Sequence, residues 1–330
     1  MYDGITEALG PTQSKTARLK SISGEVITDK RKQMEQWVEY CAELYPRENS
    51  VVDSALDAIE PLPIMEDLDA EPTLEELSKA VDSLACGKAP GTDGIPIDII
   101  KHCKCTLLQP LHDTLCQCWR EGDVPQDMRD AKIVTLYKNK GDKSDCNNYR
   151  GISLFSIVGK VYARVVLARL QQLAERVYPE SQCGFRAERS TVDMIFSLRQ
   201  LQEKCRQQQK PFYIAFINLT KAFDLISRDG LFKILLKFGC PRNLHSMIRS
   251  FHDDMKATIQ YKGSISEPFN IKSGLKQGCV LATTLFGIFF SLSNMPLGHR
   301  PKQCTCTQGQ MASCTISQDS EQRPRSAKPP

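Results

Sequence analysis

Several signals that would assign this chain to a broad class are missing. It has fourteen cysteines but no pair with the C-x-x-C spacing typical of zinc sites. The N-terminus has no secretory signal pattern, so we expect reduced, mostly buried thiols. The most apolar run, Cys279 to Leu292, is shorter than the ~20 residues that a membrane span needs. We therefore expect a soluble intracellular protein, cytoplasmic or nuclear, without membrane contact.

Basic side chains are absent from one long stretch. Residues 48–76 contain ten Asp or Glu and no Lys or Arg, and we interpret the acidic, proline-containing part at 46–72 as a linker. The other 301 residues carry 43 basic and 29 acidic side chains, a net charge of +14. This cationic body suits a polyanionic partner. A solvated surface with one acidic linker explains the same numbers, so charge alone leaves both readings open.

Hydrophobic periodicity predicts an α+β protein with long amphipathic helices. Thr73 and Glu76 have the spacing of a capping box at the start of one helix. Helices are expected near residues 28–45, 73–84, 96–119, 156–177, 191–208, 228–238 and 280–292. Strands are expected as hairpins at 131–154 and 258–271 and as an apolar strand at 212–219. Residues 293–330 are polar and lack periodicity, and we expect them to be disordered.

Six short motifs follow one another along the chain. They are GKAPGTDGIP at 87–96, KIVTLYK at 132–138, NYRGISL at 148–154, SQCGFRAERST at 181–191, FINLTKAFD at 216–224 and SGLKQGCVL at 273–281. In this order and spacing they resemble the reverse transcriptase of LINE-type (non-LTR) retrotransposons over about residues 73–290. The resemblance implies a polymerase right-hand fold. It also implies RNA-directed DNA synthesis from dNTPs on an RNA–DNA primer-template, by two-metal phosphoryl transfer with Mg²⁺.

The resemblance also assigns roles to individual residues. The nucleotide-binding set is Lys138, Arg150, Phe223, Gln277 and Gly278. In this set the two basic residues would hold the triphosphate, and the aromatic ring would exclude a ribose 2′ hydroxyl. The last two would lie beside the nascent base pair. The template-binding set is Lys88, Arg186 and Arg189, with Ser190 in the same segment.

The chain departs from the family pattern where the metals would bind. Asn218 stands at the position of the first catalytic aspartate, and an amide oxygen brings no negative charge to hold two dications. On the residues alone, Asp224 is a candidate metal ligand or a helix cap. The Tyr/Phe-Ala-Asp-Asp motif is missing, since no Asp-Asp pair follows residue 254. We therefore expect no intact metal site and no productively bound Mg²⁺.

These observations predict polymerase fingers plus an incomplete palm, with the thumb absent, in a truncated and degenerate copy of the family. The expected domains are an N-terminal helix and acidic linker at 1–72, a reverse transcriptase domain at 73–292 and a disordered polar tail at 293–330. We expect a catalytically inactive chain. The alternatives are a non-catalytic remnant that binds nucleic acid and a relic without function. The oligomeric state is left open.

Overall fold

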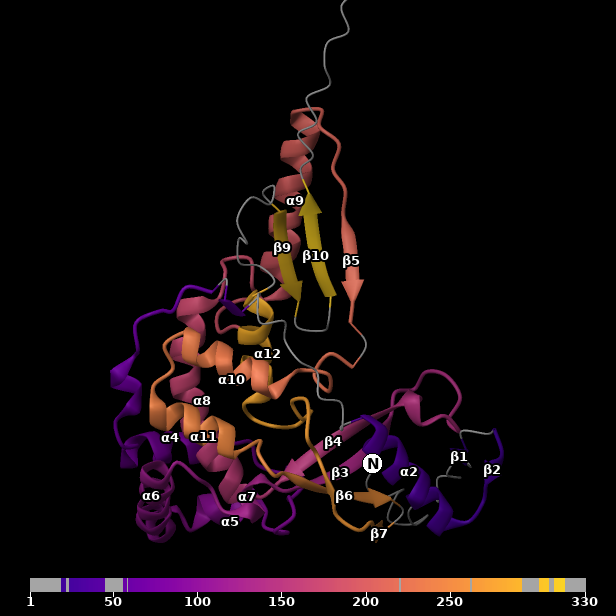
Figure 1. The fold of residues 1–330 in the computed structure, drawn as a ribbon, viewed down its shortest axis with the longest axis vertical. Helices are drawn as coiled ribbons and strands as arrows, with labels where there is room; N and C mark the ends of the chain where they lie inside the picture. Colours follow the sequence, from indigo (N-terminus) through magenta and orange to yellow (C-terminus); the bar gives the residue numbers. More distant parts are fainter. Residues whose placement is uncertain are drawn as a thin grey trace, which may run out of the picture.

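The longest helix, α8 (Ile157–Val177), is buried on nearly all sides, and the other helices of the larger core gather around it (Figure 1). The computed structural model describes residues 19–21, 24–44, 56–57, 59–219, 221–261, 263–292, 303–308 and 312–317. The larger core also contains α4 (Leu74–Ser83), α5 (Ile97–His102), α6 (Lys104–Glu121), α7 (Gln126–Arg129), α10 (Arg228–Lys237), α11 (Arg242–Ser250) and α12 (Ala282–Ser291). None of the described helices is long and apolar enough to cross a membrane.

Most of these helices were predicted, and the capping box of α4 is confirmed, because Thr73 Oγ1 accepts from the Glu76 amide. The helix α11 was missed, although its buried Leu244, Met247 and Ile248 have helical spacing. It is short, and the chain enters it through Pro241, so its pattern spans too few turns to be detected. Most of the described cysteines are buried, as predicted.

The main sheet has five strands, in the order β4-β3-β6-β7, with β8 also paired to β6. The predicted hairpin at 131–154 is confirmed as β3 (Ala131–Tyr137) and β4 (Tyr149–Phe155). The second predicted hairpin is confirmed, with β7 as an additional short strand. Its strands are β6 (Lys256–Tyr261), β7 (Ser264–Ile265) and β8 (Phe269–Asn270). Because β3 pairs in parallel with β6, the sheet joins two segments that lie far apart in the sequence.

The N-terminal helix α2 (Lys30–Leu44) covers this sheet and forms a second core with it. Trp37 and Cys41 of α2 pack with residues of β3 and β6 such as Ile133 and Ile259. The Trp37 ring also meets the Tyr149 ring edge-on, with 5.1 Å between centroids. The short strands β1 (Leu19–Lys20) and β2 (Val26–Ile27) precede the helix. The apolar face of the predicted N-terminal helix therefore has a partner within the chain.

The acidic stretch is only partly a linker. Residues 59–72 pack against the helical layer, and Leu68 of the short 3-10 helix η1 (Glu66–Asp69) is buried in the larger core. The prediction of a linker over 46–72 is therefore wrong for this part. Ile59 is also buried in that core, and Leu62 and Met65 pack against it. These apolar residues have no regular spacing, so the acidic and proline-containing composition suggested a linker instead.

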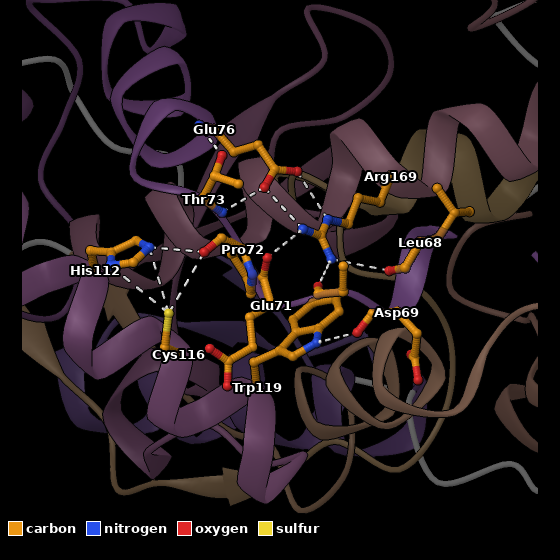
Figure 2. A network of polar contacts seen from close by, with 11 residues as sticks. Leu68, Asp69, Glu71, Pro72, Thr73, Glu76, His112, Cys116, Trp119 and Arg169 are labelled. Atoms are coloured by element: carbon orange, nitrogen blue, oxygen red, sulfur yellow. Dashed lines mark hydrogen bonds and ion pairs between the residues drawn. The ribbon is translucent and has the colours of Figure 1, made fainter. Parts of the chain in front are cut away.

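Arg169 of α8 donates hydrogen bonds to backbone carbonyls of residues 68–71 (Figure 2). Its guanidinium forms a two-pronged ion pair with Glu76, with N–O distances of 3.0 and 2.9 Å. It also donates to three backbone oxygens, those of Leu68, Ala70 and Glu71. Its planar face lies 4.6 Å from the ring of Trp119, whose indole N–H donates to the Asp69 carbonyl. One buried cation thus holds residues 68–71 against α4, α6 and α8.

Replacing Arg169 with Leu should lower the free energy of unfolding by about 3–5 kcal/mol, because it leaves a half-buried carboxylate and several backbone carbonyls unpaired. Urea denaturation followed by circular dichroism measures the change. Arg176→Leu is the matched control, since Arg176 is more exposed and donates only to the Pro63 carbonyl, at 2.7 Å. Equal losses in the two variants would contradict the assignment.

The strand that carries Asn218 lies outside the main sheet. β5 (Ala215–Asn218) is shorter than the predicted strand at 212–219. It pairs antiparallel with β10 (Ala312–Ser317), which pairs in turn with β9 (Gln303–Gln308). Figure 1 shows these strands and α9 (Thr191–Gln207) extending away from the other helices. The prediction of disorder over 293–330 is therefore wrong for two segments. Strand pairing with a distant edge supplied order that local composition does not reveal.

Candidate functional site

Three of the motifs meet in space through backbone contacts of one loop, residues 273–278. The Leu275 amide donates to the Phe223 carbonyl at 2.8 Å, and the Gly274 amide donates to the Ile226 carbonyl at 3.0 Å. On the other side, the Ser153 amide of β4 donates to the Gln277 carbonyl at 2.8 Å. The loop therefore connects the chain after β5 to the β3–β4 hairpin.

Two glycines make this close approach possible. Gly274 has φ +73°, and a Cβ atom there would lie 2.3 Å from the Asp224 carbonyl oxygen. Gly278 has φ +112°, and its Cβ would lie 2.3 Å from the Ser153 carbonyl oxygen. Both positions demand a residue without a side chain, for backbone conformation and for space. Gly278 thus allows the close approach of another backbone segment of this chain, at Ser153. Its predicted place beside a nascent base pair stays a prediction.

Gly274→Ala should destabilise the fold more than Gly94→Ala. Both glycines have positive φ, but a Cβ at Gly94 meets nothing within 4 Å. We expect Gly94→Ala to cost about 1–2 kcal/mol from backbone strain alone. Gly274→Ala should exceed it by about 1–3 kcal/mol from the added clash. Chemical denaturation of both variants tests the difference, and equal costs would show that the loop moves away freely.

Arg228, at the start of α10, anchors the same loop from behind. Its buried guanidinium donates to the carbonyls of Gly274 and Ile271, each at 3.0 Å, and to that of His252. Burial lowers the pKa of Arg228 to about 10. Arg228 lies outside the six motifs and was not predicted as a site residue. A cation in the first turn of a helix opposes the helix dipole, and that mismatch was the available signal of a tertiary partner.

His252 is buried beside Arg228. Its Nδ1 donates to the Ile248 carbonyl at 2.8 Å, and Arg228 in turn donates to the His252 carbonyl. Burial lowers the pKa of His252 to about 3, with the charges of Arg228 and Lys276 acting in the same direction. The imidazole therefore stays neutral in the folded protein well below the usual histidine pKa of about 6.5.

This shift has a calculable effect on stability. Between about pH 6.5 and 3 the unfolded histidine binds a proton that the folded one does not. The contribution of His252 is therefore complete above about pH 6.5 and is lost as the pH falls towards 3. We expect His252→Asn to flatten the acid side of the stability profile measured by denaturant unfolding. An acid slope identical to that of the natural sequence would contradict the assignment.

The charges around Asp224 decide the chemistry of this site. Asp224 is half-buried, and burial raises the pKa of its carboxyl. Three ammonium groups oppose that rise, those of Lys276, Lys221 and Lys138. The Asp224 carboxyl therefore lies within electrostatic range of cations from three separate segments. Lys221 and Lys276 lie inside motifs that the sequence analysis quoted, but their spacing gave no sign that they approach Asp224.

Lys276 is the most deeply buried of the three, with a side chain only 1% exposed. Its ammonium donates to the Ser273 carbonyl at 2.9 Å. Burial lowers the pKa of Lys276 well below its ordinary value; Arg228 adds to the effect and Asp224 opposes it. Lys221 has φ +54°, and its ammonium lies 4.9 Å from the ring of Tyr40 in α2. The N-terminal helix therefore borders the site.

The two predicted triphosphate ligands lie on one face of the β3–β4 hairpin. Arg150 pairs with Leu136 in the ladder, and the Lys138 amide donates to the Asn148 carbonyl at 2.8 Å. Since side chains two residues apart share a face, Lys138 and Arg150 are diagonal neighbours. Both are exposed, and the Lys138 ammonium donates to the Asn147 carbonyl at 2.8 Å. The hairpin thus presents two cations on one face, and one of them, Lys138, is close enough to Asp224 to lower its pKa.

Phe223 belongs to an aromatic cluster. Its ring stacks on Phe286 of α12, with centroids 4.5 Å apart, and meets Phe185 edge-on at 6.2 Å. Its packing role is therefore visible, and its role at a nucleotide sugar stays a prediction. The side chain of Gln277 is exposed beside this region, and its contact with a nucleotide also stays a prediction.

The predicted template-binding residues have local partners of their own. Arg186 pairs with Glu175 at 3.0 Å, and Arg189 pairs with Glu180. Ser190 caps α9, whose Asp193 completes the capping box. Lys88 is exposed in the motif at 87–96. That loop is fixed to α8, because the Asp93 carboxylate accepts from the Ile157 amide at 2.7 Å. Template contact by these residues stays a prediction.

The residues present do not fit a pair of Mg²⁺ ions. The backbone of Asn218 pairs with Ala312 of β10, and the segment 303–317 that forms the neighbouring hairpin contains no Asp or Glu. Within the described part of the chain, no group of three or more His, Cys, Asp or Glu could hold a metal ion. Two-metal catalysis needs several carboxylates around both ions. Among the described residues, the charges that act on the Asp224 carboxyl are those of lysines.

Comparison with known proteins identifies the family. Residues 138–316 match the family described as "Reverse transcriptase (RNA-dependent DNA polymerase)". The chain belongs to this family. Its helices and sheets accordingly form a reverse-transcriptase-like polymerase fold. Among solved structures, a telomerase from Candida albicans in complex with a fragment of telomeric RNA covers 63% of this chain and 40% of its own, at 11% identity and a TM-score of 0.45.

Relatives from mobile elements confirm the resemblance to non-LTR retrotransposons. The chain is 26% identical over 224 residues to the "Transposon TX1 uncharacterized 149 kDa protein" of Xenopus laevis, covering 68% of this chain and 17% of that protein. Two Drosophila melanogaster relatives are RNA-directed DNA polymerases. One, described as probable, is from transposon BS (27% identical; 71% and 26% covered) and the other from mobile element jockey (28%; 69% and 25%). The chain therefore spans about a quarter or less of each relative's length.

Proposed function

We propose that this reverse transcriptase family protein binds nucleic acid without synthesising DNA. The observation that carries the proposal is the charge around Asp224. Among the described residues, no group of three or more His, Cys, Asp or Glu could hold a metal ion, and the charges that act on the Asp224 carboxyl are those of Lys276, Lys221 and Lys138. The three lysines repel further positive charge, so the Asp224 carboxyl gives a dication little electrostatic advantage.

The same cations favour a polyanion. In our proposal the β3–β4 hairpin and the loop at 87–96 form the fingers, and the segments after β5 form an incomplete palm, within a domain at 73–292. Lys138 and Arg150 would contact phosphates of an RNA–DNA primer-template or of a dNTP, and Lys88, Arg186 and Arg189 would lie towards the template. Phosphate contacts by Lys and Arg release counterions, so the affinity should fall steeply with salt.

The binding half of the proposal is tested with a labelled RNA–DNA primer-template titrated across salt concentrations. We expect the Lys138→Gln, Arg150→Gln double variant to bind more weakly and to lower the slope of log affinity against log salt by about two. Chelation of divalent cations should not change binding. Lys79→Gln is the matched control, because Lys79 is an exposed lysine paired with Glu75 on α4. Binding that is independent of salt, or unaffected by the double variant, would contradict the proposal.

The catalytic half is tested by primer extension with Mg²⁺ or Mn²⁺. We expect no incorporation by the natural sequence, and none by Asn218→Asp, because restoring one carboxylate leaves the others missing. Incorporation by the natural sequence would overturn the proposal. Incorporation by Asn218→Asp alone would show that the remaining ligands are present and that a single substitution separates this chain from an active enzyme.

A further inference from the structure

The helix α9 has apolar side chains on two faces, and only one of them is covered. On the inner face, Met194, Leu198 and Leu201 form a small cluster with residues just before β5, Phe212 and Ile214. This cluster accounts for the packing of α9 beside its three-stranded sheet. The other face is not needed for that packing.

The outer face begins with three exposed apolar residues. Val192, Ile195 and Phe196 are 69%, 50% and 63% exposed, and their spacing places them on one side of the helix. A single exposed apolar side chain is ordinary, but three adjacent ones that include an aromatic ring indicate a binding surface.

Along the same face the helix becomes basic. Arg199 lies three residues beyond Phe196, and Arg206 lies two helical turns further on. Residues 196–210 contain four Lys or Arg and one Glu. Neither Arg199 nor Arg206 forms an ion pair within the part of the chain that the structure describes, unlike Arg186 and Arg189 before the helix. The face therefore combines an available aromatic ring with available cations.

We propose that this face of α9 is an accessory site for single-stranded nucleic acid. Unpaired bases stack on Phe196, and the flanking phosphates lie at Arg199 and Arg206. Single-strand sites combine aromatic platforms with cations along the backbone, whereas bases within a duplex are already stacked. A protein partner would gain from burying the apolar patch but would have to desolvate two arginines, so the charge favours a polyanion. The inference rests on the proposed function and adds a second surface to it.

The test uses the full chain and a fluorescein-labelled oligoadenylate of 15 nucleotides, followed by fluorescence anisotropy. Phe196→Leu keeps an apolar side chain and removes the aromatic ring, and should weaken binding about 5- to 100-fold, the range expected for one stacked base. Ile195→Leu, on the same face, is the control and should bind like the natural sequence.

The Arg199→Gln, Arg206→Gln double variant tests the phosphate contacts and should lower the slope of log affinity against log salt by about 1.4. An RNA duplex of the same length should bind Phe196→Leu and the natural sequence equally.

Unchanged oligoadenylate binding by Phe196→Leu would overturn the inference. The proposed function would survive that result if the Lys138, Arg150 double variant still weakened primer-template binding, and the two failures are therefore distinguishable. Sedimentation analysis tests the alternative that a second copy of this chain binds the outer face of α9. A dimer of the natural sequence that Phe196→Leu converts to monomer would assign the face to protein contact and would also overturn the inference. Thermal melting should show that all variants keep the stability of the natural sequence.

Discussion

A buried ammonium group is the constraint around which the site is organised. The side chain of Lys276 is almost completely covered, and such a charge is tolerated inside a protein only when partners compensate it. The Ser273 carbonyl accepts one of its hydrogen bonds, and the Asp224 carboxylate supplies the opposite charge. Arg228 holds the backbone of the surrounding loop, and Gly274 lets that loop touch the Asp224 backbone. Together these contacts give Asp224 a structural role, which is to stabilise the charge of the buried Lys276.

The structural role of Asp224 bears on whether this polymerase fold can bind two divalent cations. In a two-metal site carboxylates outnumber nearby ammonium groups, because two dications must be held close together. Here the balance is reversed, and Asn218 adds no charge. Lysines and arginine at such a site favour phosphate contact, which is the basis of the nucleic-acid binding that we propose. Membership of the reverse transcriptase family and a site that does not suit metals are therefore compatible, because a fold and the chemistry of a site on it can change separately.

Local patterns predicted most of the helices and the β3–β4 hairpin, because periodicity and capping residues act over a few positions. The same patterns could not reveal partners that are distant in sequence. The helix α2 had an apolar face without a visible partner, and residues 59–72 looked like a linker until Arg169 was seen to bind their carbonyls. The strands β9 and β10 were missed for the same reason, since their order depends on pairing with β5.

The sequence by itself determined the family, through the order and spacing of six motifs, and it shows a neutral amide at position 218. It also placed Lys138 and Arg150 on the two arms of one hairpin, because a tight β ladder brings its arms together. Only the tertiary structure decided which charges face Asp224. Lys138, Lys221 and Lys276 come from a hairpin, a loop after β5 and the loop before α12, and no local rule relates these segments. Their approach results from long-range backbone contacts and close glycine packing, which a linear pattern does not record.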